Sequence, residues 1–325
     1  GLTREDGSRP MLIAVTQLTS TDEETMKDIK ATTKTFPEFM DKLGKTPISA
    51  NMSSYIGHGA IRNKVMGYSP EAPTPEQLEE MKALCDMVFC AVDMKKEEIK
   101  ALEEAYAKAE IPVVSNNSAH RWTPDVPMVI PEINPEHLAV IEAQRARLGT
   151  KRGFIAVKPN CSIQSYVPML TALMEFEPYE VVATTYQAIS GAGKTFNEWP
   201  EMIDNVIPYI GGEEEKSEKE PLKIWGKVEG NEIVDATSPL ITCQCIRVPV
   251  TNGHTAAIFM SFENKPSKEE ILKAWAEYKG LPQELELPNA PEQFITYFEE
   301  DNRPQCAIDR EIYGGMGITA GRLRE

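Results

Sequence analysis

The sequence predicts an α/β protein: a doubly wound parallel, Rossmann-like sheet that is incomplete or divergent at its start, followed by an α+β domain. Short apolar segments alternate with helical segments over residues 76–158, which is the pattern of a parallel sheet. Longer strands dominate after that point. The 325 residues, 41% of them hydrophobic, suffice for two domains. We therefore expect a first domain over 1–158, in which 1–75 is atypical, and a second over 159–325.

The first domain shows regular structure after a proline-containing stretch at residues 70–75. Its predicted elements are, in order, a helix over 76–84, a strand over 87–92, an amphipathic helix over 96–109, a strand over 111–114, a helix over 135–148 and a strand over 153–157. Continuous apolar runs such as 87–92 are typical of strands buried on both faces. Because ligands bind at the carboxyl ends of parallel strands, we expect functional groups directly after these strands.

The predicted strands of the second domain are longer than those of the first. The predicted strands span 180–189, 241–250, 255–263 and 294–298, and helices are expected near Trp199 and over 268–278. No internal repeat or low-complexity tract interrupts this part of the chain. The mixture indicates an α+β domain.

Charge and cysteine content restrict the possible functions. Lys and Arg number 34 against 50 Asp and Glu, a formal charge of −16, which disfavours nucleic acid and anionic membrane as partners. No apolar run approaches the roughly 20 residues needed to cross a bilayer, and no signal-peptide pattern is present, so we expect a cytoplasmic protein. Six scattered cysteines predict reduced thiols rather than a disulfide framework. The pair in Cys243-Gln244-Cys245 lacks further ligands nearby, so no metal site is predicted.

Cys161 is the first candidate for chemistry. It follows the predicted strand over 153–157 and the dipeptide Pro159-Asn160, and it precedes a helix expected from about Ile163. A thiol at a helix N-terminus has a lowered pKa and a larger thiolate fraction. The alternative is a buried structural cysteine, which is the commoner fate of a free thiol.

His254 and Arg247 are further candidates, and both lie close to a turn between two predicted strands. His254 ends the segment Thr251-Asn252-Gly253-His254, and imidazole is the side chain best suited to move protons near neutral pH. An ordinary core or surface role is the alternative. Arg247 lies within an apolar strand, where an unpaired charge is costly, so we expect it to meet a carboxylate of the protein or of a ligand.

Gln187 and Arg121 also follow predicted strands. Gln187 precedes the small-residue loop 188–193, which would let backbone amides approach a ligand or would simply form a tight turn. Arg121 follows the polar segment 115–119 at the carboxyl end of a predicted parallel strand. A guanidinium in that position can bind phosphate through two hydrogen bonds; otherwise Arg121 is a surface arginine.

The order of several short motifs resembles the aspartate-semialdehyde dehydrogenase family, in the variant found in archaea, fungi and some bacteria. The resemblance covers about residues 85–325. The matching motifs are VVSNNSAHR at 113–121 with DVP at 125–127, PNCS at 159–162, QAISGAG at 187–193, DNVIP at 204–208, GEEEK at 212–216, RVP at 247–249 with GH at 253–254, GMG at 315–317 and GR at 321–322.

The resemblance implies the chemistry of this family. Cys161 would be the nucleophile that attacks the acyl phosphate L-aspartyl-4-phosphate, and His254 the general acid/base for the thioester and thiohemiacetal steps. Gln187 would orient the substrate, and Asn160 would help to stabilise the oxyanion. NADPH would reduce the thioester, giving aspartate semialdehyde and phosphate for the synthesis of lysine, threonine and methionine.

The resemblance also implies the binding residues. Arg247 would bind the substrate's α-carboxylate and Glu213 its ammonium group, while Arg121 and Lys216 would bind the phosphate. NADP would contact the loop that holds Ser190, Gly191 and Gly193, and the first domain would be its binding domain. The second domain would carry catalysis and dimerisation, and the family is typically a homodimer or homotetramer.

The N-terminal part of the sequence departs from the family pattern. Family members begin with a strand and a glycine-rich loop that binds the cofactor's phosphates, and no such motif is found; Gly57-His58-Gly59-Ala60 lacks the strand and helix that a phosphate loop needs. Residues 11–21 instead resemble a strand and turn of orotidine monophosphate decarboxylases. The family's final helix is also not found.

Two explanations and several functions stay open from the sequence. The chain is either a partial or chimeric reading frame or a divergent member that rebuilt its first βα unit. A catalytically impaired binding protein without the nucleotide site is the alternative function, followed by a related acyl-CoA reductase and a thiol hydrolase, which shares the need for Cys and His.

Overall fold

The computed structural model describes residues 65–66, 74–83 and 85–324 and divides the chain into two compact units, 1–88 and 89–325. In the first unit the longest described element is helix α4 (Pro75–Ala83), close to the helix predicted over 76–84. Residues 11–21 and the segment 57–60 lie outside the described residues. The candidate residues named above all lie in the second unit.

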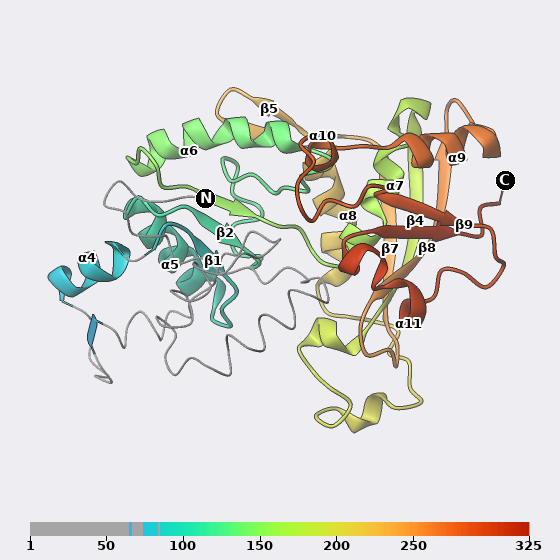
Figure 1. Ribbon diagram of the computed structural model, residues 1–325, viewed down its shortest axis with the longest axis horizontal. Helices are drawn as coiled ribbons and strands as arrows, with labels where there is room; N and C mark the ends of the chain where they lie inside the picture. Colours follow the sequence, from blue (N-terminus) through green and yellow to red (C-terminus); the bar gives the residue numbers. More distant parts are fainter. Residues whose placement is uncertain (1–64, 67–73, 84, 325) are drawn as a thin grey trace, which may run out of the picture. The chain divides into compact units, whose positions relative to one another are not determined.

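A small sheet starts the second unit and has the strand order β1-β2-β3 (Figure 1). Its strands are β1 (Val88–Cys90), β2 (Val113–Ser115) and β3 (Ile155–Val157), and β2 pairs with β3 in parallel. Helix α5 (Lys96–Lys108) joins β1 to β2, and the short helix η1 (Pro135–Val140) with α6 (Ile141–Leu148) precedes β3. This is the predicted βαβ alternation, and it brings the carboxyl ends of β2 and β3 to one edge.

The buried side of α6 completes this sheet with a side-chain amide. Gln144 is fully buried; its Nε2 donates to the carbonyl of Ile155, and its Oε1 accepts from the Ile155 N–H. The amide therefore pairs with β3 as a neighbouring strand would, so the backbone groups of Ile155 are satisfied without another strand.

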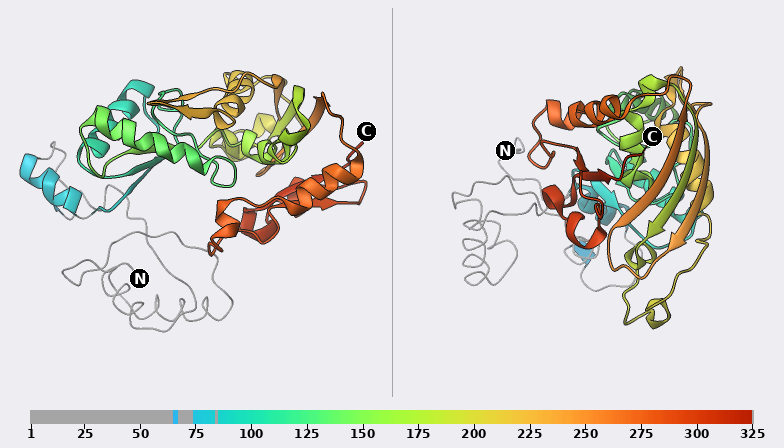
Figure 2. Two further views of the ribbon diagram at one scale, coloured as in Figure 1. Left: turned by 90° about the horizontal axis from the view of Figure 1, so that it is seen from above. Right: turned by 90° about the vertical axis from the view of Figure 1, so that its right-hand side faces the viewer.

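The second sheet, with order β7-β4-β8, contains the three longest strands. They are β4 (Pro178–Gln187), β7 (Leu240–Arg247), which pairs in parallel with β4, and β8 (His254–Phe262), which pairs antiparallel; Figure 2, right, shows them side by side in yellow-green to orange. Helix α8 (Glu213–Ile224) packs against β7. Because side chains alternate along a strand, Ala183, Cys243 and Cys245 face the interior of this layer.

A third group of elements holds the main apolar core of the C-terminal part. Helix α9 (Lys268–Glu277) packs on β9 (Ile295–Phe298), which pairs in parallel with β10 (Ile318–Gly321). Ser267 caps α9 by accepting from the Glu270 N–H. The core buries Leu173, Ile271, Trp275, Phe294, Ile295 and Ala320.

Short elements connect these layers. They are η2 (Ile163–Ser165), α7 (Val167–Thr171), η3 (Met174–Phe176), η4 (Ile189–Ala192), η5 (Pro200–Met202), the hairpin of β5 (Lys227–Glu229) and β6 (Glu232–Val234), α10 (Leu281–Glu284), α11 (Cys306–Asp309) and η6 (Ile312–Gly315).

The predicted fold class is confirmed, two predicted helices need correction, and one helix was not predicted. The helix expected from Ile163 is a 3₁₀ turn, and α7 begins only at Val167, with proline as its second residue. The helix expected near Trp199 is also a 3₁₀ turn, η5. Helix α8 was not predicted, because its sequence is highly charged and contains a proline. Within the described residues, none of the helices combines the length and hydropathy required to span a bilayer.

The packing of α5 against the start of β3 predicts that Gly153 tolerates no side chain. A Cβ at this position would lie 1.8 Å from the carbonyl oxygen of Ala107. We expect Gly153→Ala to lower the free energy of unfolding, measured with urea, by about 3 kcal/mol, since the backbone of α5 cannot move away cheaply. Gly211→Ala, where a Cβ would meet nothing within 4 Å, is the matched control and should change it by less than about 0.5 kcal/mol.

Candidate active site

The register of the second sheet places three polar side chains in one row. Gln187 at the end of β4 pairs with Arg247 on β7 and with His254 on β8. Residues paired in register project from the same face of a sheet. Gln187 and Arg247 are almost fully buried, so the row lies on the inward face. Gln187 therefore meets Arg247 and His254, which come much later in the sequence, at one end of the sheet.

Cys161 faces this row from the turn that follows β3. The Cys161 side chain is exposed, and its Sγ lies 3.3 Å from His254 Nε2. The short turn η2 and the five-residue α7 that follow are too small to provide a strong helix dipole. The helix N-terminus expected beside the sulfur is therefore replaced by these two short elements, and His254 is the side chain in contact with the thiol.

His254 is held in one orientation by the backbone. Its Nδ1 accepts a hydrogen bond of 3.1 Å from the Ala188 N–H. In the neutral ring the hydrogen then sits on Nε2, which is the nitrogen directed at Cys161. Burial lowers the pKa of His254, and the positive charge of Arg247 lowers it further. The ring is thus neutral at pH 7 and presents an N–H to the sulfur.

Arg247 is a buried cation without a carboxylate partner. Arg247 is only 5% exposed, and its Nη1 donates to the Ala188 carbonyl at 2.6 Å. Burial lowers the pKa of Arg247, and the charge of Glu213 opposes this only in part. The carboxylate partner expected from the sequence is not found among the ion pairs of the described residues.

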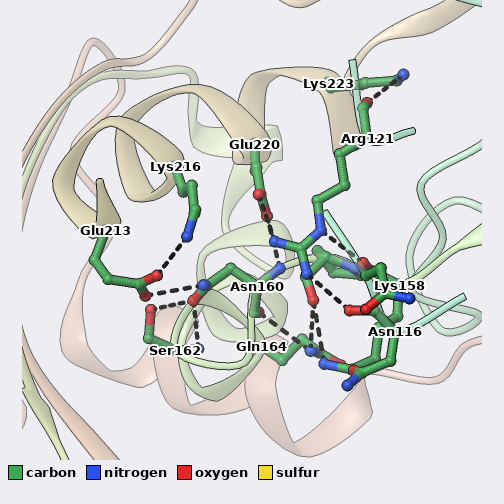
Figure 3. Close-up of polar contacts among 12 residues, drawn as sticks. Asn116, Arg121, Lys158, Asn160, Ser162, Gln164, Glu213, Lys216, Glu220 and Lys223 are labelled. Carbon is green, nitrogen blue, oxygen red and sulfur yellow. Dashed lines mark hydrogen bonds and ion pairs between the residues drawn. The ribbon is translucent and has the colours of Figure 1, made fainter. Parts of the chain in front are cut away.

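Glu213 connects α8 to Asn160, the residue before Cys161. Its Oε2 accepts from Asn160 Nδ2 at 2.9 Å and its Oε1 from Lys216 Nζ at 2.7 Å (Figure 3). Burial acts to raise the pKa of Glu213, but Lys216, Asn160 and Gln187 outweigh it and the pKa is lowered. Glu213 is therefore ionised at neutral pH beside Cys161's turn.

Arg121 is buried rather than a surface arginine. Its Nη1 donates to Glu220 Oε1 at 2.9 Å, its Nε to the Lys158 carbonyl at 3.1 Å and its Nη2 to the Asn116 carbonyl at 3.3 Å. Three of the roughly five N–H donors of a guanidinium are thereby occupied. Any ligand of Arg121 would have to use the donors that remain.

The loop after Gln187 differs from its expected role as a group of free amides. The N–H groups of Ser190, Gly191 and Gly193 donate to the carbonyls of Thr251, Ala188 and Ser190, so they are occupied by backbone partners. What matters in this loop is instead the space that Gly191 leaves for its neighbours. A Cβ at Gly191 would come within 2.9 Å of Arg247 Nη1 and 3.1 Å of His254 Cε1. Glycine therefore keeps the space beside the thiol clear.

The candidate residues thus meet in one place, with two groups that the sequence did not single out. Lys158, three residues before the thiol, has a pKa lowered by burial and interacts electrostatically with Cys161. Glu220 is fully buried against Arg121. A lysine next to the PNCS motif was the available signal for the first; no sequence pattern pointed to the second. In the part of the chain that the structure describes, no cluster of His, Cys, Asp and Glu could hold a metal ion.

Comparisons with known proteins agree on one family. The family model "Semialdehyde dehydrogenase, NAD binding domain" matches residues 57–141, and "Semialdehyde dehydrogenase, dimerisation domain" matches residues 170–325. The aspartate-semialdehyde dehydrogenase of Methanothermobacter thermautotrophicus is 36% identical over 302 residues, 89% of this chain and 85% of that protein. The enzyme of the same name from Archaeoglobus fulgidus is 43% identical over 242 residues, 74% of this chain and 68% of that protein.

A solved structure is similar in fold as well as in sequence. The crystal structure of aspartate semialdehyde dehydrogenase with NADP from Candida albicans has a TM-score of 0.66 and 36% identity, and the match covers 75% of this chain and 69% of that one. The structure of aspartate semialdehyde dehydrogenase II from Vibrio cholerae, at 22% identity and a TM-score of 0.57, shares the fold.

The electrostatics of the site predict the titration of His254. Because burial and Arg247 both favour the neutral ring, its NMR titration midpoint should lie below the ordinary value of about 6.5. Arg247→Gln should move the midpoint upward by removing the positive charge. His120 is an internal reference, since burial lowers its pKa but Arg247 is not among its neighbours. An unchanged His254 midpoint in the variant would contradict the assigned coupling.

Proposed function

Since this chain belongs to the aspartate-semialdehyde dehydrogenase family, we propose that it catalyses the NADPH-dependent reduction of L-aspartyl-4-phosphate to L-aspartate 4-semialdehyde and phosphate, in aspartate-family amino-acid biosynthesis. One observation carries the proposal. The exposed thiol of Cys161 lies 3.3 Å from the imidazole of His254, beside the buried guanidinium of Arg247. A nucleophile, a proton carrier and a carboxylate clamp are what this reaction requires.

The substrate would bind across the end of the second sheet. Arg247 takes the α-carboxylate, because its buried charge is not paired with a carboxylate of the described residues. Glu213 takes the ammonium group, for which its lowered pKa keeps it ionised. Lys216 and the two remaining donors of Arg121 take the phosphate. Gln187 lies in register between Arg247 and His254 and orients the acyl group.

Cys161 then forms the covalent intermediate. Its thiolate attacks the acyl carbon and phosphate leaves with the electrons of the broken C–O bond, which gives a thioester on Sγ. Asn160 steadies the developing oxyanion. NADPH, when bound, supplies the hydride that reduces this thioester. Hydride addition would leave an alkoxide, to which the Nε2–H of His254, which already faces Sγ, donates a hydrogen bond; as this oxygen re-forms the C=O bond, the C–S bond breaks, Sγ leaves as thiolate and the aldehyde is freed.

The described residues fit the reactive end of a nicotinamide cofactor. Residues 190–193 of the loop are exposed and carry nothing larger than a hydroxyl, and a Cβ at Gly191 would crowd Arg247 and His254. We assign the contact with NADP to these three residues. The phosphate-binding part of the nucleotide site belongs, in this proposal, to the domain ending near residue 158, of which 57–141 match the NAD-binding family model.

The outer face of the second sheet is where we place the subunit interface of a homodimer or homotetramer. Val182 and Phe259 pair in register on the face opposite to α8, and Tyr186 lies on the same face. Phe259 is 67% exposed, so an apolar patch of this sheet is open to a second copy. The dimerisation-domain model covers residues 170–325 and includes all three strands. A cytoplasmic location is part of the same proposal, in keeping with six free cysteines.

The proposed reaction is tested by cofactor binding and turnover. We expect NADPH fluorescence to change on titration with micromolar protein, and NADP to be reduced with aspartate semialdehyde only when phosphate is present. Turnover without phosphate would indicate hydrolysis of the thioester instead. If NADPH does not bind, the alternative of a folded protein that keeps the substrate pocket without hydride transfer replaces the proposal.

The nucleophile is tested by replacing its sulfur. Cys161→Ala should lower kcat by at least about 10⁴-fold, because no other group can carry the acyl intermediate. Cys306→Ala removes a partly buried thiol that bonds to Thr255 instead of His254 and should keep most of the activity. Circular dichroism should show that both variants are folded. Substantial turnover by Cys161→Ala would end the assignment.

The interface is tested by a charge on the open sheet face. Phe259→Asp should reduce the molar mass measured by light scattering to that of a smaller assembly, because burying an unpaired carboxylate opposes association. Leu285→Asp, at an exposed position outside the sheet, is the matched control and should leave the mass unchanged. An unaltered mass for Phe259→Asp would place the interface elsewhere.

A further inference from the structure

Glu220 contacts two different parts of the site with its two carboxylate oxygens. The residue is fully buried on α8. Its Oε1 accepts from Arg121 Nη1 at 2.9 Å, and its Oε2 accepts from the backbone N–H of Asn160 at 2.6 Å. Figure 3 shows Glu220 between these two groups. One carboxylate thus joins the cation proposed for phosphate binding to the residue immediately before Cys161.

Arg121 extends this connection to the ends of two strands. It donates to the carbonyl of Asn116, directly after β2, and to the carbonyl of Lys158, directly after β3. Lys223, one helical turn beyond Glu220, donates to the carbonyls of Arg121 and Thr123 at 2.7 and 3.0 Å. The guanidinium is therefore held by Glu220 of α8 and by two carbonyls at strand ends, while Lys223 of α8 holds the backbone of Arg121.

Asn160 passes the constraint to the nucleophile. With its backbone held by Glu220, its Oδ1 accepts from the Ser162 N–H at 2.9 Å and from the Ser162 hydroxyl at 2.7 Å. Its Nδ2 donates to Glu213. Cys161 consequently lies between two residues whose positions are set by buried hydrogen bonds, although its own side chain is exposed.

The two-sided bonding distinguishes Glu220 from a carboxylate that only stabilises the fold. A buried arginine needs one acidic partner to compensate its charge. Asp125 serves Arg147 in that simple manner, with both of its oxygens on the same guanidinium. One oxygen of Glu220 accepts from the Arg121 guanidinium, and the other accepts from the backbone N–H of Asn160, the residue before Cys161.

We propose that Glu220 is a positioning residue that sets the distance between the Cys161 thiol and the Arg121 guanidinium. It does so by binding Arg121 and the backbone of Asn160 with a single rigid carboxylate. This proposal rests on the proposed function, in which the acyl carbon and the phosphate of one substrate must reach these two groups at once. Positioning errors of about 1 Å can cost on the order of 100-fold in rate.

Two variants test the proposed role of Glu220 in holding both Arg121 and Asn160. Glu220→Gln has a single acceptor oxygen and must turn an N–H donor toward either Arg121 or Asn160. Glu220→Asp keeps the buried charge but is one methylene too short to reach both partners, so it serves if the Gln variant does not fold. For each we expect kcat of phosphate-dependent NADP reduction to fall about 10- to 100-fold and KM for phosphate to rise about threefold or more.

A cofactor-free measurement accompanies the kinetics. Alkylation of Cys161 by iodoacetamide, quantified on its peptide by mass spectrometry, should be slower by about threefold or more in both variants, because the thiol loses its set contact with His254. The control is Asp125→Asn, which removes a buried carboxylate whose partner is the exposed Arg147. It should lower Tm but leave kcat and the alkylation rate within about twofold of the wild type.

The outcomes separate the two proposals. If the Glu220 variants lose Tm as Asp125→Asn does, yet keep kcat, phosphate KM and the alkylation rate within about twofold, Glu220 is a stability residue only and the inference is overturned. If the wild type itself lacks dehydrogenase activity, the proposed function fails, and the alkylation rate still decides whether Glu220 positions Cys161.

Discussion

The buried carboxylate of Glu220 is the interaction on which the organisation of this site depends. A charge withdrawn from water costs several kcal/mol unless it is paired and hydrogen-bonded, and Glu220 meets that requirement with Arg121 and the Asn160 N–H. Those partners belong to the two loops that follow β2 and β3. Helix α8 cannot move without uncovering the charge, so the helix of the second domain fixes the strand ends of the first sheet.

The second sheet supplies the rest of the chemistry through its register. Pairing of β4 with β7 and β8 brings Gln187, Arg247 and His254 into one row. The Ala188 backbone contacts both neighbours: its N–H holds His254 Nδ1 and its carbonyl holds Arg247 Nη1. The orientation of the imidazole and the placement of the cation are therefore properties of the sheet.

The charge distribution resolves an apparent conflict between a strongly acidic chain and a phosphorylated substrate. The whole sequence has a formal charge of −16. Around Cys161, however, lie the cations Lys158, Lys216 and Arg247, with Arg121 behind them. Two of the four, Lys216 and Arg121, are balanced by Glu213 and Glu220. The site therefore carries positive charge although the whole chain is acidic, which is the balance that a phosphorylated substrate requires.

The sequence by itself determined the alternation of strands and helices after residue 85, because apolar periodicity shows which faces are buried. Motifs around the strand ends also singled out Cys161, His254, Gln187 and Arg247 as candidates. Only the tertiary structure decided that Arg121 is buried and that Glu220 bridges it to the nucleophile's turn. Helix α8 was not predicted because several of the side chains that it buries are polar or charged. Its buried face carries Glu220 and Lys223, which bind the side chain and the backbone carbonyl of Arg121, about 100 residues away in the chain, and no local pattern contains that information.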